Sequence, residues 1–306
     1  MIRYISFRLL LALPALWLIV TMVFMLAHIV PGDPVAQMLG EGARADDLQQ
    51  LRHTLGLDLP IPVQYGRYLA GVVHGNLGES FRFQQPVLQV VISHYPATLE
   101  LAFVALLVCA GIGIPAGLMA AQRRGTSTDH AIGVLTLFGL SVPNFALGPV
   151  LILVFSVMLG WLPVSGRGGP LHLILPAVTL GAALAAILTR MVRTSVIEEL
   201  SSDYVRTARA KGLSESAVLF RHAFRNALIP IITILGLQFG TLLAGTIVTE
   251  SIFSWPGIGR LAVQAISARD YPLLQGCILI IAVSYVLVNL LTDLVYAFVD
   301  PRVRFE

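Results

Sequence analysis

The residues that could do chemistry are few, and the spacings that catalysis requires are missing from the sequence. The only lysine, Lys211, follows Arg209 and Ala210, so no Gly-x-x-x-x-Gly-Lys-Ser/Thr loop is available to hold a nucleotide phosphate. The sequence contains neither His-Glu-x-x-His nor Gly-x-Ser-x-Gly, and Cys109 and Cys277 lie in separate apolar runs. We therefore expect no catalytic residue, no metal ligands and no cofactor bound by this chain itself.

Ionisable groups inside the apolar runs are also scarce. They are His28, Glu100, Glu250 and Asp293, and Asn289 shares a helix face with Asp293 at the i, i+4 spacing. We interpret the first three as groups at membrane interfaces that touch water. Asn289 and Asp293 fit either hydrogen bonding between helices or the lining of a path. So few charges disfavour an intramembrane enzyme and a self-sufficient carrier driven by protons or sodium.

One apolar run carries a Gly-x-x-x-Gly pattern at Gly236 and Gly240. This spacing allows two helix backbones to approach closely. The partner helix could belong to this chain or to a second membrane subunit, and the pattern alone leaves both alternatives open.

The densest group of polar signals lies between Ser201 and Glu215, where the sequence predicts a short helix. Ser202 or Asp203 can cap its N-terminus, Arg209 and Lys211 suit its last turn, and Gly212 suits the left-handed position after it. A helix of about nine residues is marginal in water by itself, so it must rest on something.

A second helix is predicted to follow, capped by Ser214 and running toward Asn226. Two supports for this basic region remain open: an anionic lipid surface, or a groove in a soluble partner.

The composition indicates which kind of secondary structure positions these residues. Of the 306 residues, 56% are hydrophobic and 12% are charged, about half the charge of a typical soluble domain, and the mean hydropathy is +0.81. These values exclude a disordered, collagen-like, coiled-coil or disulfide-stapled chain. The basic residues form no soluble patch, so no nucleic-acid partner is expected. The composition predicts an all-α integral membrane protein.

Six apolar runs are long enough to cross a bilayer as helices. They run from Leu9 to Val30, Ala97 to Ala121, Ala131 to Leu159, His172 to Thr189, Ile229 to Thr249, and Gly276 to Val299.

Orientation follows from the basic residues. A cytoplasmic N-terminus places 13 of the 20 basic residues on the cytoplasmic side, which predicts that both termini are cytoplasmic. Residues 31–96 then form an external segment, with short helices near 49–55 and 62–73, and residues 190–228 form a cytoplasmic loop.

The region from Asp203 to Leu213, followed by Arg221-His-Ala-Phe-Arg-Asn-Ala-Leu-Ile-Pro230, resembles the permease subunits of binding-protein-dependent ABC importers of the dipeptide, oligopeptide and nickel group. The resemblance covers nearly the whole chain. Further matching stretches are Pro31-Gly-Asp-Pro34, Leu55-Gly-Leu-Asp58, Pro96-Ala-Thr-Leu-Glu100, Trp161-Leu-Pro-Val-Ser165, Ile174-Leu-Pro176, Trp255-Pro-Gly-Ile-Gly-Arg260, Arg269-Asp-Tyr-Pro272 and Asp300-Pro-Arg302.

The resemblance implies a type I importer transmembrane domain of six helices. Residues 1–93 would form an N-terminal helix and the external segment, residues 94–299 the core with its cytoplasmic coupling loop 190–228, and residues 300–306 a cytoplasmic tail. It also implies a bacterial inner-membrane location, a second homologous permease, two cytoplasmic ATPases that bind ATP and magnesium, and an external solute-binding protein.

The resemblance further implies that the short cytoplasmic helix couples the permease to the ATPases. The coupling residues would be Asp203, Tyr204, Arg206, Thr207, Ala208, Arg209, Ala210, Lys211, Gly212 and Leu213. Importer permeases usually carry Glu-Ala-Ala-x-x-x-Gly here, and Arg206 replaces that glutamate. Di- and oligopeptides are the first expected substrates, with glutathione and nickel chelates as rivals.

Overall fold

The computed structural model describes residues 2–29, 35, 39, 44–54 and 56–299, and side chains within residues 10–25, 35, 39, 44–54 and 56–295. The predicted turn at residues 31–34, the side chain of His28 and the tail 300–306 lie outside this part. Across the described residues the chain is almost entirely helical, with one isolated bridge between Glu79 and Pro86. This confirms the predicted all-α class.

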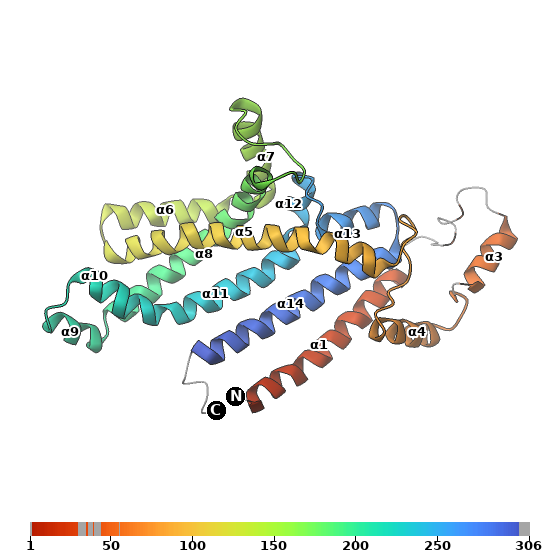
Figure 1. Cartoon of the computed structure of the whole chain (residues 1–306), viewed down its shortest axis with the longest axis horizontal. Coiled ribbons are helices and arrows are strands. Elements are labelled where there is room, and N and C mark those ends of the chain that lie inside the picture. The colour runs from red at the N-terminus through yellow and green to blue at the C-terminus, as the bar shows by residue number, and fades with distance from the viewer. Residues whose placement is uncertain (1, 30–34, 36–38, 40–43, 55, 300–306) are drawn as a thin grey trace.

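Long apolar helices form the body of the molecule (Figure 1). They are α1 (Ile2–Ile29), α5 (Val87–Gln122), α8 (Pro170–Leu200), α11 (Phe224–Gly245) and α14 (Tyr271–Val299). By length and composition, four helices of the described residues can span a membrane, or five if one bent pair counts as a span. The apolar part described for α1 is the shorter stretch Leu10–Met25. The predicted number of six spans therefore stays a prediction.

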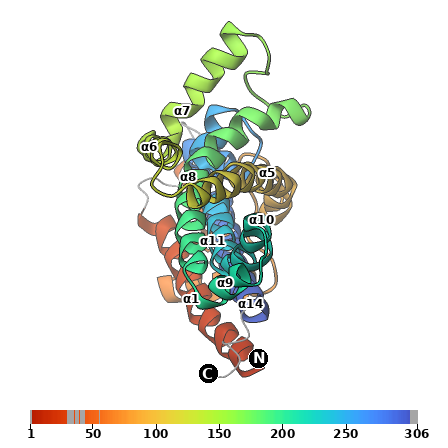
Figure 2. The same cartoon turned by 90° about the vertical axis from the view of Figure 1, so that its left-hand side faces the viewer.

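The run predicted as one span over 131–159 is broken. Helix α6 (Ser127–Ser141) is followed by α7 (Asn144–Leu151) and the π-helical turn η1 (Ile152–Met158), at an angle of 99° to it. The break falls at Pro143, whose ring disfavours helical geometry in the residue before it, and Val142 is accordingly extended. Figure 2 shows α7 extending away from the other helices.

The long helices pack in the order α5, α8, α11, α14, α1. Small residues bring α5 and α8 together, because alanines such as Ala105 and Ala177 are completely buried between them. Helix α5 runs without interruption through the predicted boundary between residues 93 and 94. The division into an N-terminal unit and a core consequently stays a prediction.

The two ends of the bundle carry different short elements (Figure 1). One end carries α9 (Asp203–Ala210), α10 (Glu215–Ala217) and the π-helical turn η2 (Val218–Ala223). The other end carries α3 (Ala45–Thr54), α4 (Ile61–Val73), α12 (Ile247–Ile252) and α13 (Ile258–Ser267). The predicted loop 190–228 is thus mostly helical, because α8 continues to Leu200.

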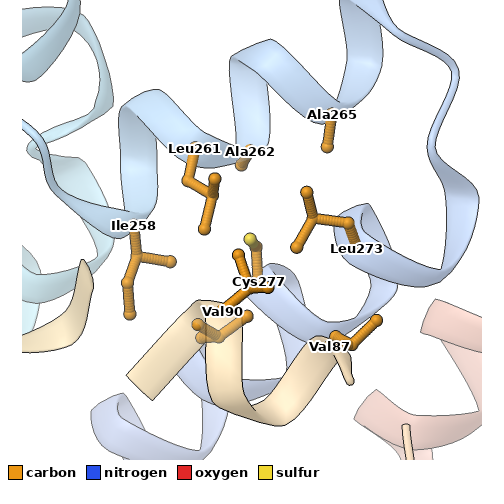
Figure 3. Packing of buried hydrophobic residues seen from close by; sticks show 9 residues of the cluster. Val87, Val90, Ile258, Leu261, Ala262, Ala265, Leu273 and Cys277 are labelled. Carbon is orange, nitrogen blue, oxygen red and sulfur yellow. The ribbon is translucent and has the colours of Figure 1, made fainter. Parts of the chain in front are cut away.

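The end with α12 and α13 has a compact apolar core of its own (Figure 3). Val87 and Val90 at the start of α5 face Leu261 on α13 and Leu273 and Cys277 on α14. Each of these side chains is at most 4% exposed. This packing fixes the loop between α11 and α14 against the extension of α5.

Candidate functional site

Helix α9 lies where the sequence predicts it. It begins after Ser202, which has the extended backbone of a cap residue, although its hydroxyl bonds to the Glu198 carbonyl at 3.4 Å instead of capping. At the other end Gly212 has φ +78°, its N–H bonds to the Arg209 carbonyl, and the Leu213 N–H bonds to that of Ala208. These two bonds form a Schellman motif, so the helix stops at a defined residue.

The next helix begins as predicted. The Ser214 hydroxyl accepts a hydrogen bond from the Ala217 N–H at 3.4 Å. From Glu215 the chain then stays helical to Gly245, through Pro230, which lies inside α11 rather than at its start. Helix α9 is therefore joined to a membrane-length helix by a short, capped turn.

Two contacts hold α9 against the ends of the long helices. Val205 and Ala208 are buried with Val218 of η2, next to Leu200 at the end of α8. The Tyr204 hydroxyl donates to Glu199 of α8. Burial first, and the bond to Glu199 second, raise the pKa of Tyr204 to about 12, so the phenol is neutral at physiological pH.

An ion pair closes the turn after α9. Arg209 donates from Nε and Nη2 to the two carboxylate oxygens of Glu215, at 2.9 and 3.1 Å. This paired hydrogen bond raises the pKa of the Arg209 guanidinium above its usual value. Helix α9 and its turn consequently form one small unit.

Most of the expected coupling residues lie on the outer face of this unit. Ala208 differs, because it is 6% exposed and packs inward against Val218 of the same chain. The exposed residues are Asp203, Tyr204, Arg206, Thr207, Arg209, Ala210, Lys211, Gly212 and Leu213. Ala208 thus packs on its own chain, whereas Ala210 is exposed.

Gly236 and Gly240 face α14 of the same chain. A Cβ on Gly236 would lie 2.4 Å from Oγ1 of Thr292, so only glycine permits this approach. Gly240 lies against Asn289 and Tyr285. The glycine face is therefore occupied within this chain.

Asn289 is partly buried at this α11–α14 contact, and its Oδ1 has no hydrogen-bond partner among the described residues. Asp293 is one turn further along α14 and is also partly buried, with an interaction of its own. Their expected roles, between helices or along a path, stay predictions.

The interpretation of Glu250 as a water-exposed group is wrong. Its side chain lies on α12 and is fully buried, and three hydrogen-bond donors surround the carboxylate. Oε1 accepts from the hydroxyls of Thr98 and Thr246 at 2.8 and 3.0 Å, and Oε2 accepts from the Arg260 N–H at 2.9 Å. Such bonds offset the cost of removing a carboxylate from water.

Sequence reasoning missed a second buried acid nearby. Asp270 accepts from the Ser80 hydroxyl at 2.5 Å and from the N–H groups of Arg82 and Leu273 at 3.1 and 3.2 Å. It caps α14 and ties residues 80–82 to it. The only signal was the matching stretch Arg269-Asp-Tyr-Pro272, because its partner Ser80 is 190 residues away.

Glu100 pairs with Arg167 above a buried indole. Nε and Nη2 of Arg167 both donate to Oε2 of Glu100, at 3.0 and 2.6 Å. The guanidinium carbon lies 5.8 Å from the centre of the Trp255 ring. Trp255 is completely buried, and its Nε1 donates to the Ala97 carbonyl at 2.8 Å. Three separate segments therefore meet on one side of α5.

Comparison with known protein families identifies the family to which this chain belongs. The family model described as "Binding-protein-dependent transport system inner membrane component" matches residues 113–305, and the N-terminal model of the same kind of system matches residues 1–102. The chain belongs to this family of inner-membrane permease components. The resemblance seen in the sequence and the predicted multi-pass inner-membrane location are thereby confirmed.

Full-length relatives agree with this assignment. The permease is 43% identical to the glutathione transport system permease protein GsiC of Escherichia coli O6:H1 over 306 residues. It is 44% identical to the di/tripeptide transport system permease protein DppB of Pseudomonas aeruginosa (strain UCBPP-PA14) over 336 residues. Both matches cover all of this chain and all of the relative.

Solved structures agree on the fold. A chain of the inward-facing MetNI methionine ABC transporter matches the permease with a TM-score of 0.57 at 16% identity. The match covers 70% of this chain and 97% of that one. The permease therefore shares the transmembrane fold of an ABC importer.

Proposed function

We propose that this permease is the membrane subunit of an ATP-driven importer of di- and oligopeptides. It pairs with a second homologous permease to form the path, two cytoplasmic ATPases bind ATP and magnesium, and an external solute-binding protein delivers the peptide. Membership of the binding-protein-dependent family supports this assembly, and the relatives named for peptides and glutathione support the substrate class.

The observation that carries the proposal is the build of α9. A helix of eight residues ends at a Schellman motif, is docked by Val205 and Ala208, and exposes basic residues at one end of the bundle. A soluble ATPase that grips this outer face can move α8 and α11 together. Helix α9 contacts α8 through Tyr204, and it packs on Val218 of η2, which continues into α11. The ATPase then switches the long helices between two arrangements.

The test uses the outer face of α9. Ala210→Trp and Arg206→Glu place bulk or opposite charge where the ATPase is expected, so uptake and ATPase activity stimulated by the loaded binding protein should fall at least tenfold. The matched control is Arg124→Glu, an exposed charge reversal in the turn after α5, outside both α9 and the external segment. Normal uptake by both α9 variants in a folded complex would contradict the coupling role.

The external face completes the proposal. Helix α3 has no buried residue, carries Asp46 and Asp47 in its first turn, and lies with α4 and α13 at the end away from α9. We assign the 31–96 segment and the 255–269 loop to docking of the binding protein. A complex that lacks residues 45–54 should assemble but bind the solute-binding protein at least tenfold more weakly; unchanged docking would refute this.

Glutathione is the second candidate substrate, favoured by the relative GsiC. Uptake of a dipeptide, a tripeptide, glutathione and a nickel chelate, each with the binding protein present, would rank them. A self-sufficient carrier would instead transport without ATPase subunits, and such transport would overturn the proposal.

A further inference from the structure

We infer that Arg167 and Glu100, above Trp255, form a binding site for the charged termini of a short peptide as it enters the permease. The inference rests on the proposed function and deepens it, because it assigns a specificity site to this chain as well as to the binding protein.

The position of the pair fits an entry site. Glu100 lies on α5, Arg167 lies in the loop before α8, and Trp255 follows α12, which belongs to the end of the bundle opposite α9 (Figure 1). The side chains of Arg167 and Glu100 remain 42% and 36% exposed. A solute arriving from that end can therefore reach both charges.

Arg167 and Glu100 each keep one hydrogen-bonding group that their ion pair does not use. Two donors of Arg167 converge on Oε2 of Glu100, whereas a fork-to-fork pair would use both oxygens. Among the described residues, no hydrogen bond reaches Nη1 of Arg167 or Oε1 of Glu100. One donor edge and one acceptor oxygen are thus available to a ligand.

The free groups match a peptide backbone at neutral pH. A short peptide carries an α-carboxylate, which suits the planar guanidinium, and an α-ammonium, which suits a carboxylate. The site is neutral as a pair and the ligand is a zwitterion, so binding adds no net buried charge. A peptide without a free carboxylate loses the contact with Arg167.

Hydrogen bonds hold the residues that lie beneath the Arg167–Glu100 pair in place. Thr98, two residues from Glu100, donates to Glu250 and accepts from the Ile258 N–H at 2.8 Å, while Trp255 bonds to the Ala97 carbonyl. The indole and the first turn before Glu100 are therefore held in one arrangement. Such preorganisation lets a few polar contacts discriminate between ligands.

The first experiment compares uptake of trialanine and trialanine amide by the whole complex in proteoliposomes, with the same binding protein in every sample. The uptake of each peptide by a variant complex is divided by the uptake of the same peptide by the wild-type complex. Selection by the binding protein affects both values equally and is removed from the ratio. Arg167→Gln should lower trialanine uptake about tenfold and leave amide uptake nearly unchanged. Equal loss for both peptides would overturn the site and leave a purely structural ion pair.

The exchanged pair Glu100→Arg/Arg167→Glu serves as the matched control, because it restores attraction between the two segments. If the pair only joins α5 to the loop, the exchange restores uptake of both peptides, which also overturns the inference. We expect trialanine uptake to stay low. If the wild-type complex imports no trialanine with ATP present, the proposed function itself fails, and the site falls with it.

A second measurement needs no binding protein. The chain has three tryptophans, so Trp17→Phe with Trp161→Phe leaves Trp255 as the sole emitter. In nanodiscs that hold the full chain, trialanine should shift this emission by moving the guanidinium from above the ring, and Arg167→Gln should abolish the shift. No response in the parent at millimolar trialanine would overturn the inference.

Discussion

Helix α9 and the opposite end of the bundle, which carries α12 and α13, are held by different kinds of interaction. At the end that carries α12 and α13, Glu250 and Asp270 are fully buried carboxylates, each bound by three donors of which at least one lies more than 150 residues away. Helix α9 itself is held by three small apolar residues and by exposed polar contacts. The buried carboxylate on this side of the bundle, Asp129, instead joins the start of α6 to α8 through Arg193. The α12–α13 end resists rearrangement because moving it would leave buried carboxylates without their donors. Helix α9 can shift at less cost, as a lever that an ATPase drives would require.

The largest expected effect is at Glu250. Glu250→Ala leaves the hydroxyls of Thr98 and Thr246 and the Arg260 N–H without their acceptor. We expect a loss of about 3 kcal/mol or more, because bonds to a buried charge are costly to lose.

Thermal unfolding of the permease in nanodiscs measures this loss, and the midpoint should fall by roughly 5 °C or more. The control at the other end is Asp203→Ala, whose side chain is 94% exposed and whose pair with Arg206 is worth under about 1 kcal/mol. Equal shifts for the two variants would remove the contrast between the ends.

The second prediction uses two alanines in one helix. Ala208→Leu forces extra volume between α9 and Val218, at a cost of about 1–3 kcal/mol, and should detach α9. Ala210→Leu adds the same atoms on the exposed side and should leave α9 docked. Limited proteolysis within 203–213 should increase only for Ala208→Leu, with global unfolding unchanged; equal cleavage of both would show that α9 is not docked as described.

The sequence predicts helix α9 better than the α12–α13 end, for a physical reason. Caps, the glycine turn and the basic last turn are local signals, so the bounds of α9 and the role of Gly212 could be read directly. The bonds of Glu250 and Asp270 join residues up to 190 apart, and no local pattern indicates them. The interpretation of Glu250 was wrong because a lone acid near a helix end does not reveal its donors.

The spans show the same limit. Hydropathy located the long helices but not their ends, because α8 continues as a polar helix past its apolar part to Leu200. It also missed the bend at Pro143, since two apolar helices joined at a proline have the composition of one span. Likewise, only the structure shows that Gly236 and Gly240 contact α14.

A smaller effect is expected at Gly212. Its φ of +78° costs an L-residue about 1 kcal/mol, so Gly212→Ala should loosen the end of α9. Gly125→Ala is the matched control, because Gly125 has φ +76° and open space around it but lies in the turn after α5. Both variants should lose similar stability, and only Gly212→Ala should speed hydrogen exchange across residues 203–211. Faster exchange in α9 for both would contradict local control by Gly212.

The smallest effect is a pH dependence at Tyr204. Burial and Glu199 raise the pKa of this phenol from 10.0 to about 12, so the folded state favours the neutral form. The resulting stabilisation is complete below pH 10 and is lost as the pH rises through 12, where a phenolate would face the Glu199 carboxylate.

A fluorophore attached to the Thr207→Cys variant reports the mobility of α9, since Cys109 and Cys277 are buried and should not be labelled. Its anisotropy should fall between pH 10 and 12. Tyr204→Phe should remove that transition, because no proton is left to lose at the contact; an unchanged transition would place its cause elsewhere than the contact between α9 and α8.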